Sequence, residues 1–263
     1  MQKTLNNQLK TIIALFGVLA LVVVGISSAN AEPSSNVAWT SETRNLLKNA
    51  DIANGEKIAN KCGSCHGEDG TDATPIEEED TPFLAGQIAH ATYKQIIDYQ
   101  DKKRDDKMML KKVKSLSKQD VADVSAFYAT QALPMPSVDA AKVTPEAIRL
   151  VTRGDGDRFL PPCAGCHGLN GEGSIVDVPA LAGQNTSYFI TTMTAYKDED
   201  RENDIYSRMR FIASILTEKE IEELADYYAS TGTGTELLMV ESDEEEVSPV
   251  EPEEPKAPAE PSS

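Results

Sequence analysis

The chain has 263 residues, which is enough for two small domains of about 100–150 residues each. Asp and Glu total 43 against 25 Lys and Arg, so the formal net charge at pH 7 is −18. A strongly acidic protein is repelled by polyanions, and the composition therefore argues against nucleic acid as a partner.

Residues 1–31 have the pattern of an export signal. Lys3 and Lys10 precede an apolar run at 11–26, and the sequence SSANA at 27–31 ends in an A-x-A cleavage site. A retained membrane anchor is the alternative, but the apolar run is shorter than the roughly 20 residues that a membrane-spanning helix needs. We therefore expect cleavage after Ala31.

All four cysteines belong to two copies of a C-x-x-C-H motif, CGSCH at 62–66 and CAGCH at 163–167. Two thiols three residues apart can form thioether bonds to the vinyl groups of one porphyrin, and the adjacent imidazole can bind its iron. A redox C-x-x-C motif does not require the trailing His, and a chain with three histidines can hardly supply the four ligands of a zinc site. We predict two covalently attached haem c groups, held by Cys62, Cys65, His66, Cys163, Cys166 and His167. Such haem is attached outside the bacterial inner membrane, so motif and export signal together predict a periplasmic protein.

The two motifs lie within a longer internal duplication. PFLAGQ at 82–87 corresponds to PALAGQ at 179–184, and FYA at 127–129 corresponds to YYA at 227–229. A glycine lies seven residues before each motif, at Gly55 and Gly156. Single residues in register are Tyr99 with Tyr196, Arg104 with Arg201, Met109 with Met209, and Leu116 with Leu216. The chain therefore contains two copies of one structural unit.

Each copy is predicted to be helical. Ser117 with Asp120, and Thr217 with Glu220, have the spacing of a capping box at the start of the last helix. Apolar residues follow at helical spacing, and neither copy has a convincing strand-like alternation. Each unit is expected to be a short helix, the haem motif, a loop and two further helices that close over the porphyrin. The predicted fold class is all-α.

Domain boundaries follow from the duplication and from composition. We place the export signal at 1–31, an N-terminal extension at 32–52, the first domain at 53–133, a proline-rich linker at 134–150, the second domain at 151–232, and a tail at 233–263. The segment 236–260 has ten acidic residues against one lysine, with prolines between them. Such a segment cannot bury a core, so we expect an acidic, disordered tail.

Each haem iron needs a second axial ligand, and a neutral thioether sulfur favours the ferrous state. Of the seven methionines, Met108, Met109 and Met209 lie at suitable positions. Met209 aligns with Met109, whereas Met108 aligns with an arginine, so we predict Met109 as the ligand of the first iron and Met209 as that of the second. The competing ligand is His90, which aligns with a serine and is interpreted as an exposed histidine at a helix start.

This pattern resembles the cytochrome c4 family of two-haem periplasmic electron carriers. The resemblance rests on the two C-x-x-C-H-G motifs, the paired P-x-L-A-G-Q segments and the Met-x6-Leu-Ser/Thr runs before the last helices, and it covers residues 53–230. It implies a tandem pair of class I cytochrome c domains related by a pseudo-twofold axis, each closed around one covalent haem. The carbonyls of Pro82 and Pro179 would accept the second ring N–H of His66 and His167.

The resemblance also implies that the haem propionates face each other across the domain interface. Arg104 and Arg201 match an arginine often found near these propionates. Two parts of the chain depart from the family pattern: the N-terminal extension, which contains the only tryptophan, Trp39, and the acidic tail.

These features predict an electron-transfer protein rather than an enzyme. We expect a soluble or loosely membrane-associated carrier between a respiratory donor complex or dehydrogenase and a terminal oxidase. The alternative is the electron-transfer cytochrome subunit of a periplasmic oxidoreductase, such as a sulfide-oxidising flavoprotein. A dihaem peroxidase would need one iron open to peroxide, and a methionine in register in both repeats argues against it.

Charge is distributed unevenly around the two predicted methionine ligands. Residues 101–118 contain eight basic and three acidic residues, whereas the matching stretch at 198–220 contains seven acidic and four basic ones. Two solvated helix faces with incidental charge would also give this pattern. The functional interpretation is that the basic region steers the first haem to an acidic partner, while the second domain meets a basic one.

Overall fold

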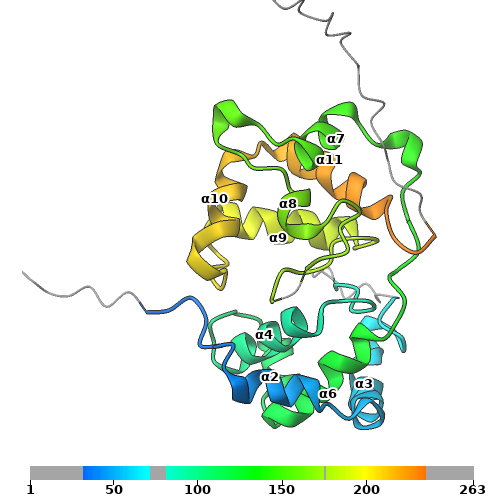
Figure 1. Cartoon of the computed structure of the whole chain (residues 1–263), viewed down its shortest axis with the longest axis vertical. Coiled ribbons are helices and arrows are strands. Elements are labelled where there is room, and N and C mark those ends of the chain that lie inside the picture. Colours follow the sequence, from blue (N-terminus) through cyan, green and yellow to red (C-terminus); the bar gives the residue numbers. More distant parts are fainter. Residues whose placement is uncertain (1–31, 72–80, 175, 235–263) are drawn as a thin grey trace, which may run out of the picture.

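The computed structural model of the protein describes residues 32–71, 81–174 and 176–234. The predicted export signal and nearly all of the predicted tail lie outside these residues. Within the described ranges the chain forms helices and two isolated bridges but no strand, and two helical lobes are stacked along the long axis of the molecule (Figure 1). None of the helices in these ranges is long and apolar enough to cross a membrane.

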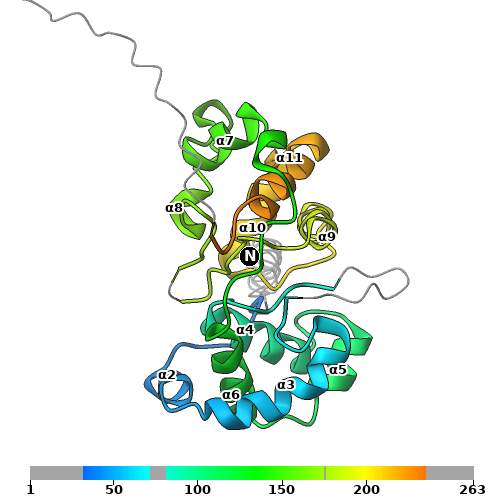
Figure 2. The ribbon, with the colours of Figure 1, turned by 90° about the vertical axis from the view of Figure 1, so that its right-hand side faces the viewer.

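The first lobe contains the first repeat. Its helices are α2 (Ser41–Lys48), α3 (Ile52–His66), α4 (Ala89–Gln100), α5 (Lys107–Val113) and α6 (Lys118–Ala129). Helix α3 packs on α6, and the two backbones approach closely at Gly55, where an added Cβ would lie 2.2 Å from the carbonyl oxygen of Asp123. Figure 2 shows α3, α5 and α6 together in this lobe.

The second lobe contains the second repeat and begins with a short 3₁₀ turn, η1 (Ala140–Lys142). Its further elements are α7 (Pro145–Thr152), η2 (Gly156–Arg158), α8 (Ala164–His167), α9 (Thr186–Lys197), η3 (Ile205–Ser207), α10 (Arg208–Ile215) and α11 (Glu218–Ala229). Helices α7 and α9 pack on α11 around a core that includes Leu150, Met193, Leu224 and Tyr228. The repeats therefore have related but unequal scaffolds.

The predicted capping boxes are confirmed at the start of α6 and of α11. The expectation of two helices after each haem motif is wrong, because each repeat has three. The additional helices, α5 and α10, are only 7 and 8 residues long. Helix α5 follows Arg104 in the sequence, and α10 follows Arg201. They carry Met109 and Met209.

The segment before the second haem motif also differs from its expected form. Helix α7 begins inside the predicted linker, and its Ala147 and Leu150 are fully buried in the second core. Gly156 is not equivalent to Gly55, because a Cβ added at Gly156 would meet no atom within 4 Å. The matching seven-residue spacing therefore does not reflect matching packing.

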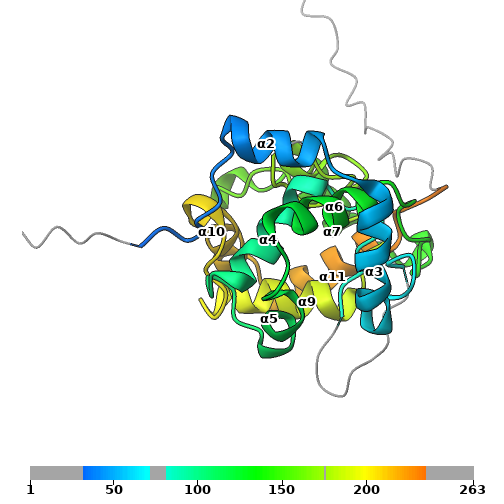
Figure 3. The ribbon, with the colours of Figure 1, turned by 90° about the horizontal axis from the view of Figure 1, so that it is seen from below.

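The N-terminal extension packs on the first repeat. Helix α2 contacts α6 and lies at the edge of the first lobe (Figure 3), and Trp39 joins a cluster around Tyr93 and Val121. The Trp39 ring stacks edge-on against His90 with a centroid distance of 4.9 Å. His90 is therefore half-buried under the extension, rather than exposed as predicted.

A buried polar network joins the two repeats. Lys94 on α4 donates to Asp98 at 2.6 Å and to the carbonyl oxygen of Asn203, in the second repeat, also at 2.6 Å. The Asn203 side chain donates to Asp98 at 2.8 Å. Asp98 and Asn203 are fully buried, so this network fixes the repeats against each other.

Candidate haem sites

The first C-x-x-C-H motif occupies the last turn of α3. Helical geometry places Cys62 and Cys65 on the same side, one turn apart, with His66 directly after them. Gly67, with a φ of 80°, ends the helix. Both cysteines are half-buried, and His66 is 6% exposed. This is the local geometry that thioether attachment and iron ligation by the histidine require.

The second motif places the same groups on a shorter element. Cys163 precedes the four-residue helix α8, and His167 ends it with 8% of its surface exposed. The thiol of Cys62 donates to Ile58, four residues earlier, whereas the thiol of Cys163 donates to Leu150, thirteen residues earlier. The first cysteine thus contacts its own helix, α3, in the first repeat, and the separate helix α7 in the second.

Both motif histidines contact the proline carbonyl that the resemblance implied. Nδ1 of His66 lies 2.9 Å from the carbonyl oxygen of Pro82, and Nδ1 of His167 lies 2.9 Å from that of Pro179. This bond orients each ring and leaves Nε2 available. Burial lowers the pKa of both histidines, which favours the neutral imidazole that binds a metal.

Two tyrosines belong to these sites although the sequence did not reveal their role. Tyr128 on α6 and Tyr228 on α11 are 1% exposed, and neither hydroxyl has a well-formed hydrogen bond within the described part of the chain. They lie beside the thiols of Cys62 and Cys163, and burial raises the pKa of both tyrosines. In the sequence, their equivalence was indicated by their matching positions in the duplicated FYA and YYA blocks.

The predicted methionine ligands lie on equivalent short helices. Met109 is half-buried on α5, where its backbone N donates to the capping carboxylate of Asp106 at 2.8 Å. Met108 is 42% exposed. Met209 on α10 packs against the core of the second repeat. Met109 is thus more buried than Met108, and burial favours Met109 as the iron ligand, as the alignment of the two repeats also did.

Arg104 and Arg201 meet at the interface between the repeats. Each guanidinium lies over a tyrosine ring of its own repeat, Arg104 over Tyr99 at 4.7 Å and Arg201 over Tyr196 at 4.6 Å. Both donate to Oε1 of Gln95 at 3.0 Å. Among the described residues, neither arginine has a carboxylate partner.

The two guanidinium groups lower the pKa of a neighbouring tyrosine. The hydroxyl of Tyr188 accepts from Arg104 at 3.1 Å. Burial alone would raise the pKa of Tyr188, but the two nearby arginines outweigh it and lower this pKa to about 7. Two half-buried cations without carboxylates fit an anionic group. With the free thiols and the oriented imidazoles, the donor set suits haem, whose propionates would supply the negative charge.

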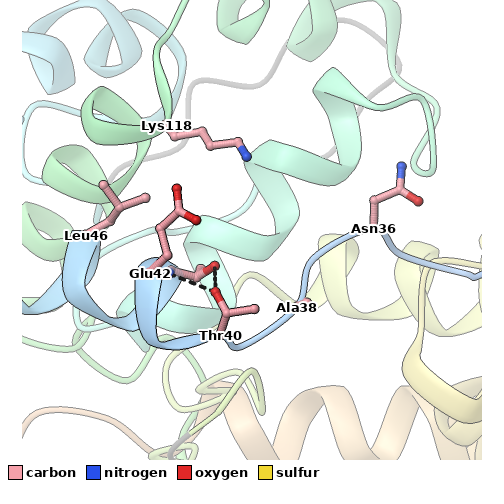
Figure 4. A pocket seen from close by; sticks show the side chains of 7 residues that line it. Asn36, Ala38, Thr40, Glu42, Leu46 and Lys118 are labelled. Atoms are coloured by element: carbon pink, nitrogen blue, oxygen red, sulfur yellow. Dashed lines mark hydrogen bonds between the residues drawn. The ribbon is translucent and has the colours of Figure 1, made fainter.

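A separate shallow pocket lies between the N-terminal extension and the start of α6. It has a volume of about 210 Å³ and contains none of the predicted ligands (Figure 4). Its lining residues are Asn36, Ala38, Thr40, Glu42, Thr43, Leu46 and Lys118. We assign it no role in haem binding.

Comparison with known proteins relates both repeats to one family. The cytochrome c family model matches residues 52–131 and 156–232, which is more than half of the chain. Cytochrome c4 from Pseudomonas aeruginosa is 34% identical over 179 residues, an alignment that covers 67% of this chain and 87% of that protein. A thiosulfate dehydrogenase electron acceptor from Stutzerimonas stutzeri is 31% identical, with 71% of this chain and 90% of that protein covered.

A solved structure agrees with the sequence comparisons. Reduced cytochrome c4 from Pseudomonas stutzeri matches with a TM-score of 0.64 and 30% identity, over 69% of this chain and 99% of that one. The predicted fold class, an all-α tandem of class I cytochrome c domains, is therefore confirmed. The chain belongs to the cytochrome c family and, within it, to the cytochrome c4 electron-transfer proteins, which bind haem c covalently.

Proposed function

We propose that the protein is a periplasmic dihaem electron carrier that takes electrons from a respiratory donor complex or dehydrogenase and delivers them to a terminal oxidase. Each repeat holds one haem c through its two cysteines. His66 and Met109 would bind the haem iron in the first repeat, and His167 and Met209 would bind it in the second. When bound, each haem supplies a one-electron Fe(II)/Fe(III) couple.

The chain's own residues prepare each site before any electron arrives. The carbonyls of Pro82 and Pro179 hold the imidazole rings in one orientation. The buried tyrosines of α6 and α11 close the cysteine side, and Arg104 and Arg201 balance the propionate charge. A site held by such fixed groups changes little between oxidation states, which suits repeated electron transfer.

The observation that carries the proposal is the shared contact at Gln95, which accepts from arginines of both repeats at 3.0 Å. If these arginines bind the propionates, both haem edges lie at this interface, and an electron can pass from one repeat to the other. The outer face of each repeat then remains available to a different protein. Such an arrangement suits a carrier with one partner at each end.

The two repeats expose different charges around their predicted methionine ligands. On and around α5 the first repeat exposes five lysines: Lys107, Lys111, Lys112, Lys114 and Lys118. In the matching stretch of the second repeat, the exposed charged residues are five acids and two bases: Asp198, Glu199, Asp200, Glu202 and Glu218 against Arg208 and Lys219. A lysine-rich face attracts an acidic partner and mainly raises the association rate.

A second candidate function is electron acceptance from one dedicated periplasmic oxidoreductase. It is favoured by the relative from Stutzerimonas stutzeri that is named a thiosulfate dehydrogenase electron acceptor. In that case the chain would serve an enzyme that oxidises a reduced sulfur compound, in line with the alternative of a sulfide-oxidising flavoprotein. Both candidates require the same two haem sites and differ in the protein that reduces them.

Two measurements test the proposal. Intact-mass spectrometry of the exported protein should give the mass of chain 32–263 plus two haems. Stopped-flow spectroscopy then follows reoxidation of the reduced holoprotein by membranes that contain a terminal oxidase. Rapid and complete reoxidation of both haems supports the carrier. Slow reoxidation, with fast reduction by a sulfur-compound dehydrogenase, would favour the second candidate, and a single haem would contradict both.

A further inference from the structure

Two glutamine side chains cross the interface between the repeats in matching ways. Gln184 of the second repeat binds the backbone of Phe83 in the first: its Nε2 donates to the carbonyl oxygen at 3.1 Å, and its Oε1 accepts from the backbone N at 2.9 Å. Gln87 of the first repeat binds Ala180 of the second in the same way, at 3.0 and 2.6 Å. In each repeat, both polar groups of one backbone residue are thus satisfied by a side chain from the other repeat.

Each bound residue directly follows the proline that orients a motif histidine. The carbonyl of Pro82, which binds His66, belongs to the same planar peptide unit as the backbone N–H of Phe83. A side chain that holds this N–H therefore also fixes the direction of the carbonyl. Gln184 holds it for the first repeat, and Gln87 holds the corresponding peptide unit between Pro179 and Ala180 for the second.

The glutamines are themselves held firmly by their own repeat. The preceding glycines, Gly86 and Gly183, have φ values of 66° and 67°, which favour glycine. Their backbone N atoms donate to the carbonyl oxygens of Tyr128 at 2.9 Å and Tyr228 at 2.8 Å. The Oε1 atom of each glutamine also accepts from the backbone N of the residue that follows it. Each glutamine thus links the last helix of its own repeat to the histidine loop of the other.

We propose that Gln87 and Gln184 are crossed positioning residues, each of which sets the axial imidazole of the haem in the opposite repeat. This inference rests on the proposed ligation by His66 and His167. A hydrogen bond from Nδ1 makes an imidazole a stronger ligand and so stabilises ferric iron. Removing Gln184 frees the peptide unit after Pro82, weakens the bond to His66, and raises the reduction potential of the first haem. The second haem keeps its own bond and its potential.

Paramagnetic NMR and redox titration of the intact holoprotein test this crossed pattern. The hyperfine-shifted haem methyl resonances are first assigned to each haem through contacts with residues of its own repeat. In Gln184→Ala we expect the methyl resonances of the first haem to shift and its potential to rise, with the second haem unchanged. In Gln87→Ala we expect the reverse. Gln131→Ala is the matched control, since the Gln131 side chain donates to Phe127 and Thr130 of its own repeat, and both haems should keep their wild-type values.

Other results would overturn the inference. Equal changes at both haems in each variant would indicate loss of the interface as a whole, and a change only at the haem of the substituted repeat, or at neither haem, would refute crossed positioning. If Gln184→Ala does not mature, Gln184→Met serves instead, because it keeps a side chain of similar volume and adds no charge but cannot hold the peptide unit before Phe83. It should change the same first haem in the same direction. A wild-type protein without two low-spin, histidine-ligated haems would instead refute the proposed function.

Discussion

The first repeat reaches its motif histidine along one continuous helix, whereas the second reaches it through three short ones. Helix α3 runs for 15 residues and ends at His66, while α7, η2 and the four-residue α8 lead to His167. The proline carbonyl, the buried tyrosine and the interface arginine are nevertheless the same in both. Each predicted haem site therefore depends mainly on the loop that contains the proline and on the last helix. The helix before the motif can differ, provided that it places the two cysteines and the histidine correctly.

The two scaffolds are also stabilised by different forces. In the first repeat, α3 approaches α6 closely at Gly55, and Asn54 donates to Asp123 at 2.7 Å. In the second, the longer connection is tied to α11 by Arg158, which donates to Glu220 at 2.6 and 3.1 Å. The second repeat thus has an ion pair between this connection and its last helix, in addition to the packing of α7 on α11.

The largest expected effect comes from disturbing the close packing in the first repeat. Gly55→Ala places a Cβ 2.2 Å from the Asp123 carbonyl, so α3 must move away from α6. We expect the free energy of unfolding to fall by roughly 1–3 kcal/mol, despite the better helix propensity of alanine. Thermal unfolding of the holoprotein measures this.

Gly156→Ala is the matched control for this comparison. A Cβ at Gly156 meets no atom within 4 Å, so the change should stay within about 0.5 kcal/mol. Equal destabilisation by the two substitutions would show that the repeats share their packing after all.

The next effect concerns the ion pair of the second repeat and its dependence on pH. The bond with Arg158 lowers the pKa of Glu220 from its usual 4.5 to about 2. A depressed folded-state pKa contributes stability above about pH 4.5, and this stability is lost as the pH falls toward 2. Glu220→Gln should therefore cost roughly 1–2 kcal/mol at neutral pH, and this cost should shrink below pH 4.5 and disappear as the pH falls below about 2.

Thermal unfolding of wild type and variant across this pH range tests the assignment. Asp120→Asn is the counterpart in the first repeat, where a hydrogen bond from Ser117 lowers the pKa of Asp120 without an arginine partner. Its cost at neutral pH should be smaller. A constant difference between wild type and Glu220→Gln at all pH values would refute the role of the charge.

The smallest effect concerns the exposed charge of the first repeat. Replacing Lys111 and Lys112 with Gln should slow electron transfer to one redox partner by roughly two- to fivefold at low salt, because the association is steered by charge. The effect should fade near physiological salt, where the Debye length is about 8 Å. Replacing Lys48 and Lys142 removes the same charge from other exposed positions and should have little effect. Slowing that is independent of salt, or equal in both variants, would indicate incidental charge.

The sequence predicted features that depend on neighbouring residues along the chain. The C-x-x-C-H motifs, the capping boxes and the duplicated blocks are local patterns, and they were sufficient for the fold class. Helices α5 and α10 were missed because 7 or 8 residues contain too few positions to show a helical period. Helix α7 was assigned to the linker because of Pro145, although a proline in the first turn, preceded by the capping residue Thr144, is a typical helix start.

Other features depend on contacts between distant parts of the chain. Three such contacts join residues that no local pattern relates. They are the ring contact between Trp39 and His90, the ion pair between Arg158 and Glu220, and the hydrogen bonds between Gln184 and Phe83. The duplication identified the two PxLAGQ segments as equivalent. It did not show that the glutamine of each segment forms hydrogen bonds with the backbone of the opposite repeat.

We propose that two unequal scaffolds hold equivalent histidine–methionine haem sites. The most direct test is the weak long-wavelength band of the oxidised holoprotein, which arises from methionine sulfur bound to ferric iron. Met109→Ala and Met209→Ala should each remove about half of this band and open that iron to added ligands, while Met108→Ala leaves it intact. Loss of the band in Met108→Ala with Met109→Ala silent, or loss of all of it in a single variant, would contradict the account.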